Sequence, residues 1–174
     1  FSDYLFNFVD WGIRYFTKSK YSHVAMIIKN PPWNKDLKGY YIIESNHETI
    51  EDSEDHEIKT GVELIPLEKV FESSSDHIYW RKLHCIRDQD FYKKLIQVHS
   101  VIHNRPYDLI ITDWFKAWKN ITIGDVHRKK TFWCSALVSY IYHMLGFLGD
   151  IPWTIISPCQ LGTEHKNHLR FKNC

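Results

Sequence analysis

Two segments carry apolar residues at the three- and four-residue spacing of an amphipathic helix. In residues 1–16 the apolar positions are Leu5, Phe8, Val9, Ile13 and Phe16. In residues 88–102 they are Phe91, Leu95, Val98 and Ile102. This spacing predicts two helices that each pack one face on a core, and the second helix should end before Pro106.

The longest apolar segment of the chain runs from residue 131 to residue 148. Thr131 is a candidate cap at its start, and Gly146 and Gly149 mark its end. Because this segment has hardly any polar face, we predict a central helix that is buried on nearly all sides. A further helical piece is predicted over 107–118, and Ser157 before Pro158 predicts the start of another helix.

Runs of β-branched and aromatic residues between turn signals predict the strands. They cover residues 21–28, 40–45, 61–67, 77–83 and 169–172, and the third of them leads into a short helix. The segment from Glu48 to Glu57 has six acidic residues in ten. Such a segment is typical of a solvated loop, although the same charges could bind a basic partner.

The composition is that of one ordinary globular domain. The chain has 174 residues, of which 44% are hydrophobic, 16% aromatic and 25% charged. A chain of this length buries enough surface to fold without disulfides or a structural metal. No linker, internal repeat or low-complexity tract divides it, so helices and strands together predict a single α+β domain over residues 1–174.

Charge, hydropathy and cysteine spacing exclude several classes of protein. The formal net charge of +1 argues against a broad basic face, so no nucleic-acid partner is expected. The longest apolar run, residues 141–148, is interrupted by His143 and Gly146 and falls short of the roughly 18–20 residues that cross a bilayer. No transmembrane segment is therefore expected. The four cysteines form no C-x-x-C pair, which favours the cytoplasm or another reducing compartment. The start at Phe1, without a Met or a signal-like leader, is interpreted as a domain boundary.

Cys134 lies near the start of the predicted buried helix. A thiol there meets the positive end of the helix dipole and unpaired backbone N–H groups, which favour the thiolate and could stabilise an oxyanion. Core packing is the alternative, because free cysteines are among the most buried residues. Cys159, which follows Ser157 and Pro158, is a rival nucleophile because it also lies in the first turn of a predicted helix.

His23 and Glu44 supply the groups that such a nucleophile needs. His23 stands at the start of an otherwise apolar strand, either as a general base or as a hydrogen-bonded core histidine. Glu44 closes the next predicted strand, where its carboxylate could orient an imidazole or face water. His23, Glu44 and Cys134 are separated by 21 and 90 residues along the chain, and folding can bring side chains together across such distances in sequence. We therefore interpret the three residues as a catalytic group.

These residues lie in segments that resemble the circularly permuted NlpC/P60 papain-like amidases, in particular the bacterial YiiX and YaeF type with relatives in poxviruses and giant viruses. The similar segments are Tyr-Ser-His-Val-Ala-Met-Ile at 21–27, Leu-Lys-Gly-Tyr-Tyr-Ile-Ile-Glu-Ser at 37–45, Gly-Val-Glu-Leu-Ile-Pro-Leu at 61–67, Phe-Trp-Cys-Ser-Ala-Leu-Val-Ser-Tyr-Ile-Tyr at 132–142 and Ser-Pro-Cys-Gln-Leu at 157–161. The histidine segment precedes the cysteine segment, which is the reverse of the unpermuted papain-like order.

The resemblance implies an antiparallel sheet packed on a central helix that carries the cysteine. It implies that Cys134 is the nucleophile, His23 the base and Glu44 the orienting residue. Two features depart from the family: Ala136 stands where many relatives carry Glu, and the Gly-Asp-rich strand that often precedes the histidine is absent. Tyr21 would share the strand face of His23 and could donate a hydrogen bond to an oxyanion, or it could serve packing alone.

Two further groups of residues have simpler interpretations. His99 and His103 would share a helix face, but the glutamate of the H-E-x-x-H motif is missing between them, so contact with solvent is expected rather than a zinc site. Asp108 and the aromatic residues of 114–118 could line an acyl or peptide site, although such a stripe is more typical of a core.

The sequence therefore predicts a cysteine-dependent hydrolase or acyltransferase. His23 would deprotonate Cys134, and the thiolate would attack the amide, ester or thioester carbonyl of a peptide, isopeptide or lipid-acyl substrate to form an acyl-enzyme. No metal or organic cofactor is implied. The alternative is a non-catalytic module on the same fold that binds lipid or protein.

Overall fold

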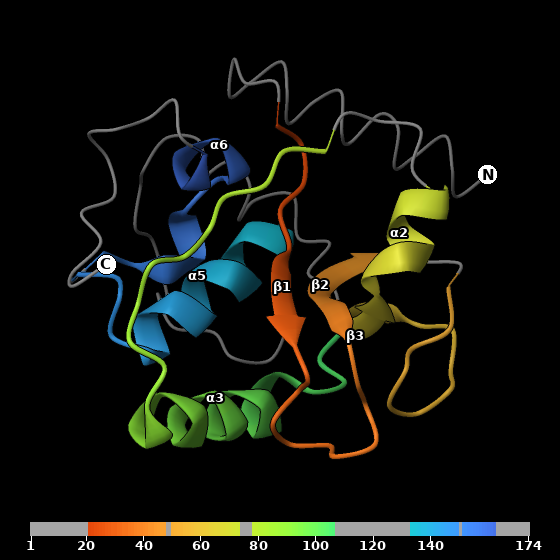
Figure 1. Cartoon of the computed structure of the whole chain (residues 1–174). Helices are drawn as coiled ribbons and strands as arrows, with labels where there is room; N and C mark the ends of the chain where they lie inside the picture. Colours follow the sequence, from red (N-terminus) through yellow and green to blue (C-terminus); the bar gives the residue numbers. More distant parts are fainter. Residues whose placement is uncertain (1–20, 48–49, 74–77, 107–132, 150, 163–174) are drawn as a thin grey trace.

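A three-stranded antiparallel sheet packs against helices, which confirms the predicted α+β class (Figure 1). The structure is a computed structural model that describes residues 21–47, 50–73, 78–106, 133–149 and 151–162. The strands lie side by side in the order β1 (Met26–Lys29), β2 (Tyr40–His47) and β3 (Thr60–Pro66). The helical elements are α2 (Leu67–Ser73), α3 (Gln89–Ile102), α5 (Cys134–Met144), the 3-10 turn η1 (Trp153–Ile155) and α6 (Pro158–Leu161).

The register of the sheet places three core residues and two buried glutamates on opposite faces. Ile43 in the central strand pairs with Met26 on one side and with Leu64 on the other. Because paired residues share a face and successive residues alternate, these three face the core cluster that contains the buried residues of α3 and α5. Glu44 and Glu63 are paired on the opposite face, and both are buried.

Helix α5 is buried on nearly all sides, as predicted. Its residues from Cys134 to Ile141 are all buried. The helix begins after Trp133, whose backbone is extended, and it ends at Leu145. Gly146 follows with a φ of 81°, a left-handed conformation that glycine adopts without strain. The predicted glycine stop is therefore confirmed.

Helix α3 confirms the amphipathic helix predicted over 88–102. Asp88 caps its start by accepting a 2.9 Å hydrogen bond from the backbone N–H of Phe91. The buried positions are Leu95, Val98 and Ile102. The start of α6 is also as predicted, because Ser157 and Gln160 form a capping box in which the Ser157 N–H donates to Gln160 Oε1 at 2.8 Å.

The chain that follows α3 returns to the sheet at Gly61. The N–H of Val62 donates to the carbonyl oxygen of Arg105 at 2.8 Å, and Gly61 forms a bridge with Pro106. Gly61 has a φ of +146°, and a Cβ there would lie 2.3 Å from the Arg105 oxygen. Only glycine accommodates both the conformation and the approach, so this residue fixes the C-terminal end of α3 against β3.

Two of the predicted strands are corrected. The strand predicted over 21–28 forms only as β1, because the chain leaves the ladder before Met26 and turns His23 towards Glu44. The described residues of the strand predicted over 77–83 form no strand. Ile78, Tyr79 and Trp80 are all exposed and only Leu83 packs on the core, so the alternation in the sequence corresponds to no buried face there.

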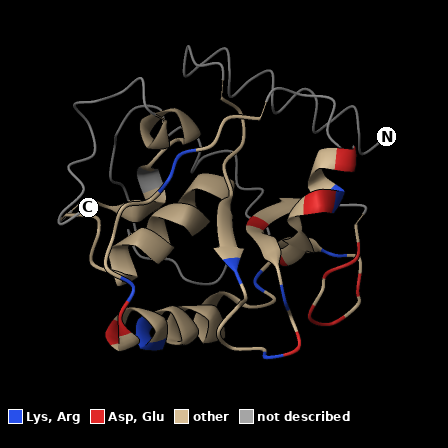
Figure 2. Cartoon of the chain, viewed as in Figure 1, with Lys and Arg blue, Asp and Glu red and all other residues tan. Residues whose placement is uncertain are grey.

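The acidic segment Glu48–Glu57 is not simply solvated. Asp52 is buried, accepts a hydrogen bond from the N–H of Leu64 and pairs with Lys59 Nζ at 2.8 Å. Lys59 also pairs with Asp55 at 2.5 Å. In Figure 2 the ribbon positions of Asp and Glu, in red, mark this loop between β2 and β3 and part of α2. The prediction was wrong for Asp52, because Lys59 and the backbone of β3 compensate its buried charge.

Several predictions fall on residues outside the described part of the chain. These are the helix over 1–16, the helical piece over 107–118 with Asp108 and its aromatic residues, the cap Thr131 and the strand over 169–172. Among the described residues, no helix combines the length and the hydropathy that a bilayer crossing requires.

Candidate active site

His23 and Glu44 lie in contact beside the start of β1. His23 Nε2 is 2.6 Å from Glu44 Oε2, which is a short hydrogen bond. Glu44 lies within β2 rather than at the end of a strand, and it is buried rather than facing water. The His23 side chain is 34% exposed. Because Nε2 donates to the carboxylate, the other ring nitrogen, Nδ1, is left for a second partner.

Contacts around the first turn of α5 fix the position of Cys134. Ser135 Oγ donates a 2.6 Å hydrogen bond to the carbonyl oxygen of Ile156 and accepts one from Trp133 Nε1 at 3.0 Å. Trp133, the N-cap residue, makes no side-chain cap hydrogen bond. The cap residue therefore leaves the first-turn N–H groups of the helix unsatisfied by its side chain. Cys134 itself is 3% exposed.

Cys134 and Glu44 both act on the imidazole of His23. Loss of contact with water by itself lowers the pKa of His23. The charge of Cys134 and its side-chain hydrogen bond raise the pKa of His23. The hydrogen bond and charge of Glu44 raise it further, so the pKa of His23 lies well above the ordinary 6.5. His23 therefore contacts Glu44 and interacts electrostatically with Cys134, and both interactions favour the imidazolium.

This group of three residues has the parts that acyl transfer requires. A thiol beside an imidazole can give its proton to the ring and attack a carbonyl carbon, and a carboxylate on the far side of the ring stabilises the resulting imidazolium. The first-turn N–H groups of α5 are donors for an oxyanion. His23 is more exposed than Cys134, so the side of the group that is open to a substrate is the imidazole side.

Tyr21 and Cys159 lie in different surroundings from this group. The Tyr21 ring packs against Gly162, where a Cβ would lie 2.7 Å from the ring, and it meets Tyr79 edge-on at 5.6 Å. Since Tyr21 precedes β1, the argument that it shares a strand face with His23 is wrong, and its oxyanion role stays a prediction. Cys159 is buried in α6, whereas the thiol that interacts with His23 is that of Cys134.

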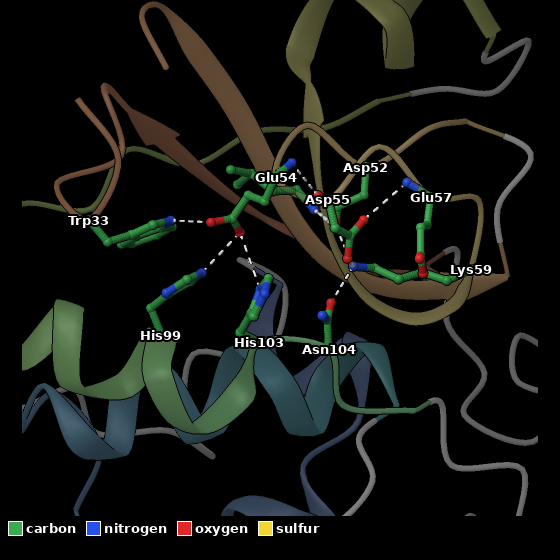
Figure 3. Close-up of polar contacts among 10 residues, drawn as sticks. Trp33, Asp52, Glu54, Asp55, Glu57, Lys59, His99, His103 and Asn104 are labelled. Atoms are coloured by element: carbon green, nitrogen blue, oxygen red, sulfur yellow. Dashed lines mark hydrogen bonds and ion pairs between the residues drawn. The ribbon is translucent and has the colours of Figure 1, made fainter. Parts of the chain in front are cut away.

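A second polar cluster, which the sequence did not reveal, joins Glu54 to His99 and His103 (Figure 3). Glu54 Oε2 lies 2.9 Å from His99 Nε2, and Trp33 Nε1 donates to Glu54 Oε1 at 2.8 Å. The expected solvent contact is therefore wrong for His99, whose side chain is largely covered. The four-residue spacing of the histidines was a signal, but their carboxylate partner comes from a loop 45 residues before His99.

Comparison with known proteins identifies no relative. No protein-family model, no curated protein and no solved structure matches this chain. The functional interpretation therefore rests on the chemistry and geometry of the described residues.

Proposed function

We propose that this chain is a cysteine-dependent hydrolase or acyltransferase with the permuted NlpC/P60 papain-like fold that its sequence resembles. One observation carries the proposal: the imidazole of His23 interacts with the Glu44 carboxylate and with the Cys134 thiol. A buried carboxylate that contacts a histidine could serve stability alone. A thiol at a helix start as the second partner of the same ring is the combination that nucleophilic catalysis uses.

In the proposed reaction, His23 takes the proton of Cys134 Sγ, and the thiolate adds to the carbonyl carbon of the substrate. The first-turn N–H groups of α5 donate hydrogen bonds to the oxyanion that forms. The imidazolium then gives its proton to the leaving amine, alcohol or thiol as the C–N, C–O or C–S bond breaks. Glu44 stabilises the imidazolium while it carries the proton.

The acyl-enzyme is released in a second half-reaction. Water or another acceptor adds to the acyl carbon as His23 takes its proton, and the C–S bond then breaks. The proton returns to Cys134 Sγ, so the free thiol is restored with a carboxylic acid or a transferred acyl group as the product.

The proposed substrates are a peptide, an isopeptide or a lipid-acyl compound. These share the carbonyl that a thiolate attacks, and the fold alone does not choose among them. Cys85, Cys134 and Cys159 are free thiols. The cytoplasm or another reducing compartment would keep the proposed nucleophile in its active, unoxidised form.

Labelling with a thiol-directed acyl probe at neutral pH tests this proposal. Wild-type protein should be acylated on Cys134, as read by mass spectrometry of the digested chain. Cys134→Ala and His23→Ala should lose the label, and Cys159→Ala should retain it because its thiol is not the one in contact with His23. Equal labelling of wild type and Cys134→Ala, with loss in Cys159→Ala, would assign the nucleophile to Cys159 instead.

A non-catalytic module that binds lipid or protein is the second candidate. It is favoured by the burial of Cys134, which is 3% exposed, and by the exposed aromatic side chains of Tyr79 and Trp80. The two candidates differ in the alkylation of Cys134 by iodoacetamide. An enzyme should react faster as wild type than as His23→Ala, whereas a binding module should react slowly in both forms.

A further inference from the structure

The cluster of Glu54, His99 and His103 brings three metal-binding side chains to one point. One ligand atom from each residue can be chosen so that all three atoms lie within 4.8 Å of one another. The three residues lie together where the loop between β2 and β3 meets α3 (Figure 3). His99 lies in the last turn of α3, and His103 caps the helix four residues later, so both imidazoles project from the same side.

Glu54 Oε2 makes a hydrogen bond to His99 and a longer approach to His103. Glu54 Oε2 is 2.9 Å from His99 Nε2 and 3.5 Å from His103 Nδ1. Two ligands of a tetrahedral zinc ion with bonds of about 2.0–2.1 Å lie about 3.4 Å apart. The 3.5 Å separation to His103 matches this spacing, and the 2.9 Å hydrogen bond to His99 would lengthen by about 0.5 Å when an ion replaces its proton.

The surroundings hold these ligands in place. Trp33 donates its indole N–H to Glu54 Oε1, which leaves Oε2 directed at the histidines. The Trp33 ring also stacks on the His99 ring, with centroids 3.9 Å apart. Asp52 Oδ1 accepts the backbone N–H of Glu54 at 2.7 Å and so fixes the loop. Such outer contacts orient metal ligands before an ion binds.

We propose that Glu54, His99 and His103 form a binding site for a divalent transition-metal ion of the zinc type. Two imidazole nitrogens and one carboxylate oxygen suit zinc, whereas magnesium and calcium prefer oxygen ligands throughout. The three protein ligands leave one position for water or another small ligand. The ion would fasten the β2–β3 loop to the end of α3. The site departs from the sequence-based expectation of no metal, and it is independent of the proposed reaction at Cys134.

Zinc titration of the metal-free chain, in competition with a chromophoric chelator, tests the site. Wild type should bind one Zn²⁺ saturably through these residues. Glu54→Gln and His103→Ala should each weaken binding by about 100-fold or more, because loss of a direct ligand exceeds the about 10- to 100-fold effect of an outer contact. The His103 side chain is 35% exposed, so this variant should keep its fold, which circular dichroism checks.

His56→Ala is the matched control. His56 Nδ1 pairs with Glu51 Oε1 at 2.7 Å in the same loop, but both side chains are exposed and the pair belongs to no cluster of three metal-binding side chains among the described residues. This variant should bind zinc as wild type does. The absence of saturable binding to wild type, or equal affinity in wild type and His103→Ala, would overturn the proposal.

Trp33→Phe separates orientation from ligation. Phenylalanine keeps an aromatic ring for stacking on His99 but cannot donate to Glu54. Zinc affinity should fall by about 10-fold or more if Trp33 orients the carboxylate. In parallel, zinc should raise the melting temperature of wild type and not that of Glu54→Gln, because only a folded site binds the ion. Equal zinc-induced stabilisation of the two proteins would contradict the site.

Discussion

Glu44→Gln tests the contact on which the proposed function depends. The change keeps the size of the side chain and removes the charge that His23 Nε2 contacts at 2.6 Å. A hydrogen bond to a charged group contributes about 1.5–3 kcal/mol. Because the His23 side chain is 34% exposed, solvent screening favours the lower part of this range. A loss of about 1.5–2 kcal/mol corresponds to about a 10- to 30-fold change in rate.

The rate of Cys134 alkylation by iodoacetamide is the assay. Glu44 favours the imidazolium form of His23, and the imidazolium in turn favours a thiolate in contact with it. We therefore expect Glu44→Gln to slow alkylation at neutral pH by about 10- to 30-fold. Mass spectrometry of the peptide that contains Cys134 separates its modification from that of Cys85 and Cys159.

Glu63→Gln is the control for replacing a neighbouring buried carboxyl group by an amide. Glu63 pairs with Glu44 across the sheet, and the two residues are 2% and 4% exposed. The carboxylate that contacts His23 is that of Glu44. Cys134 should therefore be alkylated in Glu63→Gln at the wild-type rate. The reasoning is refuted if folded Glu44→Gln reacts as fast as wild type, or if both variants slow equally.

Four other outcomes are expected. Cys134→Ala should lower the pKa of His23, read from imidazole NMR signals, because it removes the largest influence that raises this pKa and leaves the burial that lowers it. The pKa of His23 is raised in the folded state. The contribution of His23 to the free energy of unfolding should therefore be complete below about pH 6.5 and should decline as pH rises through the folded-state pKa. Urea unfolding of wild type and His23→Gln across this pH range measures the difference. Leu137→Ala should lower the free energy of unfolding by about 2–5 kcal/mol, because Leu137 is fully buried and a cavity would remain; a loss below 1 kcal/mol in urea unfolding would contradict its core position. Asp52→Asn should cost about 1.5–3 kcal/mol in the same measurement, because Lys59 loses one of its two carboxylate partners, and a neutral result would show that Asp55 suffices.

Local periodicity predicted the elements that need no pairing partner elsewhere in the chain. Helix α3 follows from the spacing of Leu95, Val98 and Ile102, because a helix satisfies its own backbone hydrogen bonds. A strand depends on a neighbour, and alternation over 77–83 does not say whether one exists. The same limit explains why the strand predicted over 21–28 is too long: its pairing ends where His23 meets Glu44.

The candidate site was predictable in its residue types but not in its geometry. A thiol at a helix start, a strand histidine and a carboxylate suggested Cys134, His23 and Glu44 before any contact was known. The contact between His23 and Glu44 depends on tertiary structure, because His23 lies before β1 and outside the paired strand residues. Glu54 was missed for a related reason: a carboxylate in an acidic loop carries no local sign that folding will place it between two histidines of a distant helix.

Gly61 has a consequence for recognising homologues of this chain. Any larger residue there would have to push the Arg105 carbonyl away by about 1 Å to restore an ordinary contact, and would do so in a backbone conformation that side chains resist. Glycine is therefore the residue that this position accommodates without a shift of the backbone. A sequence that aligns well yet lacks glycine at this point should be suspected of joining its helix to its sheet by a different route.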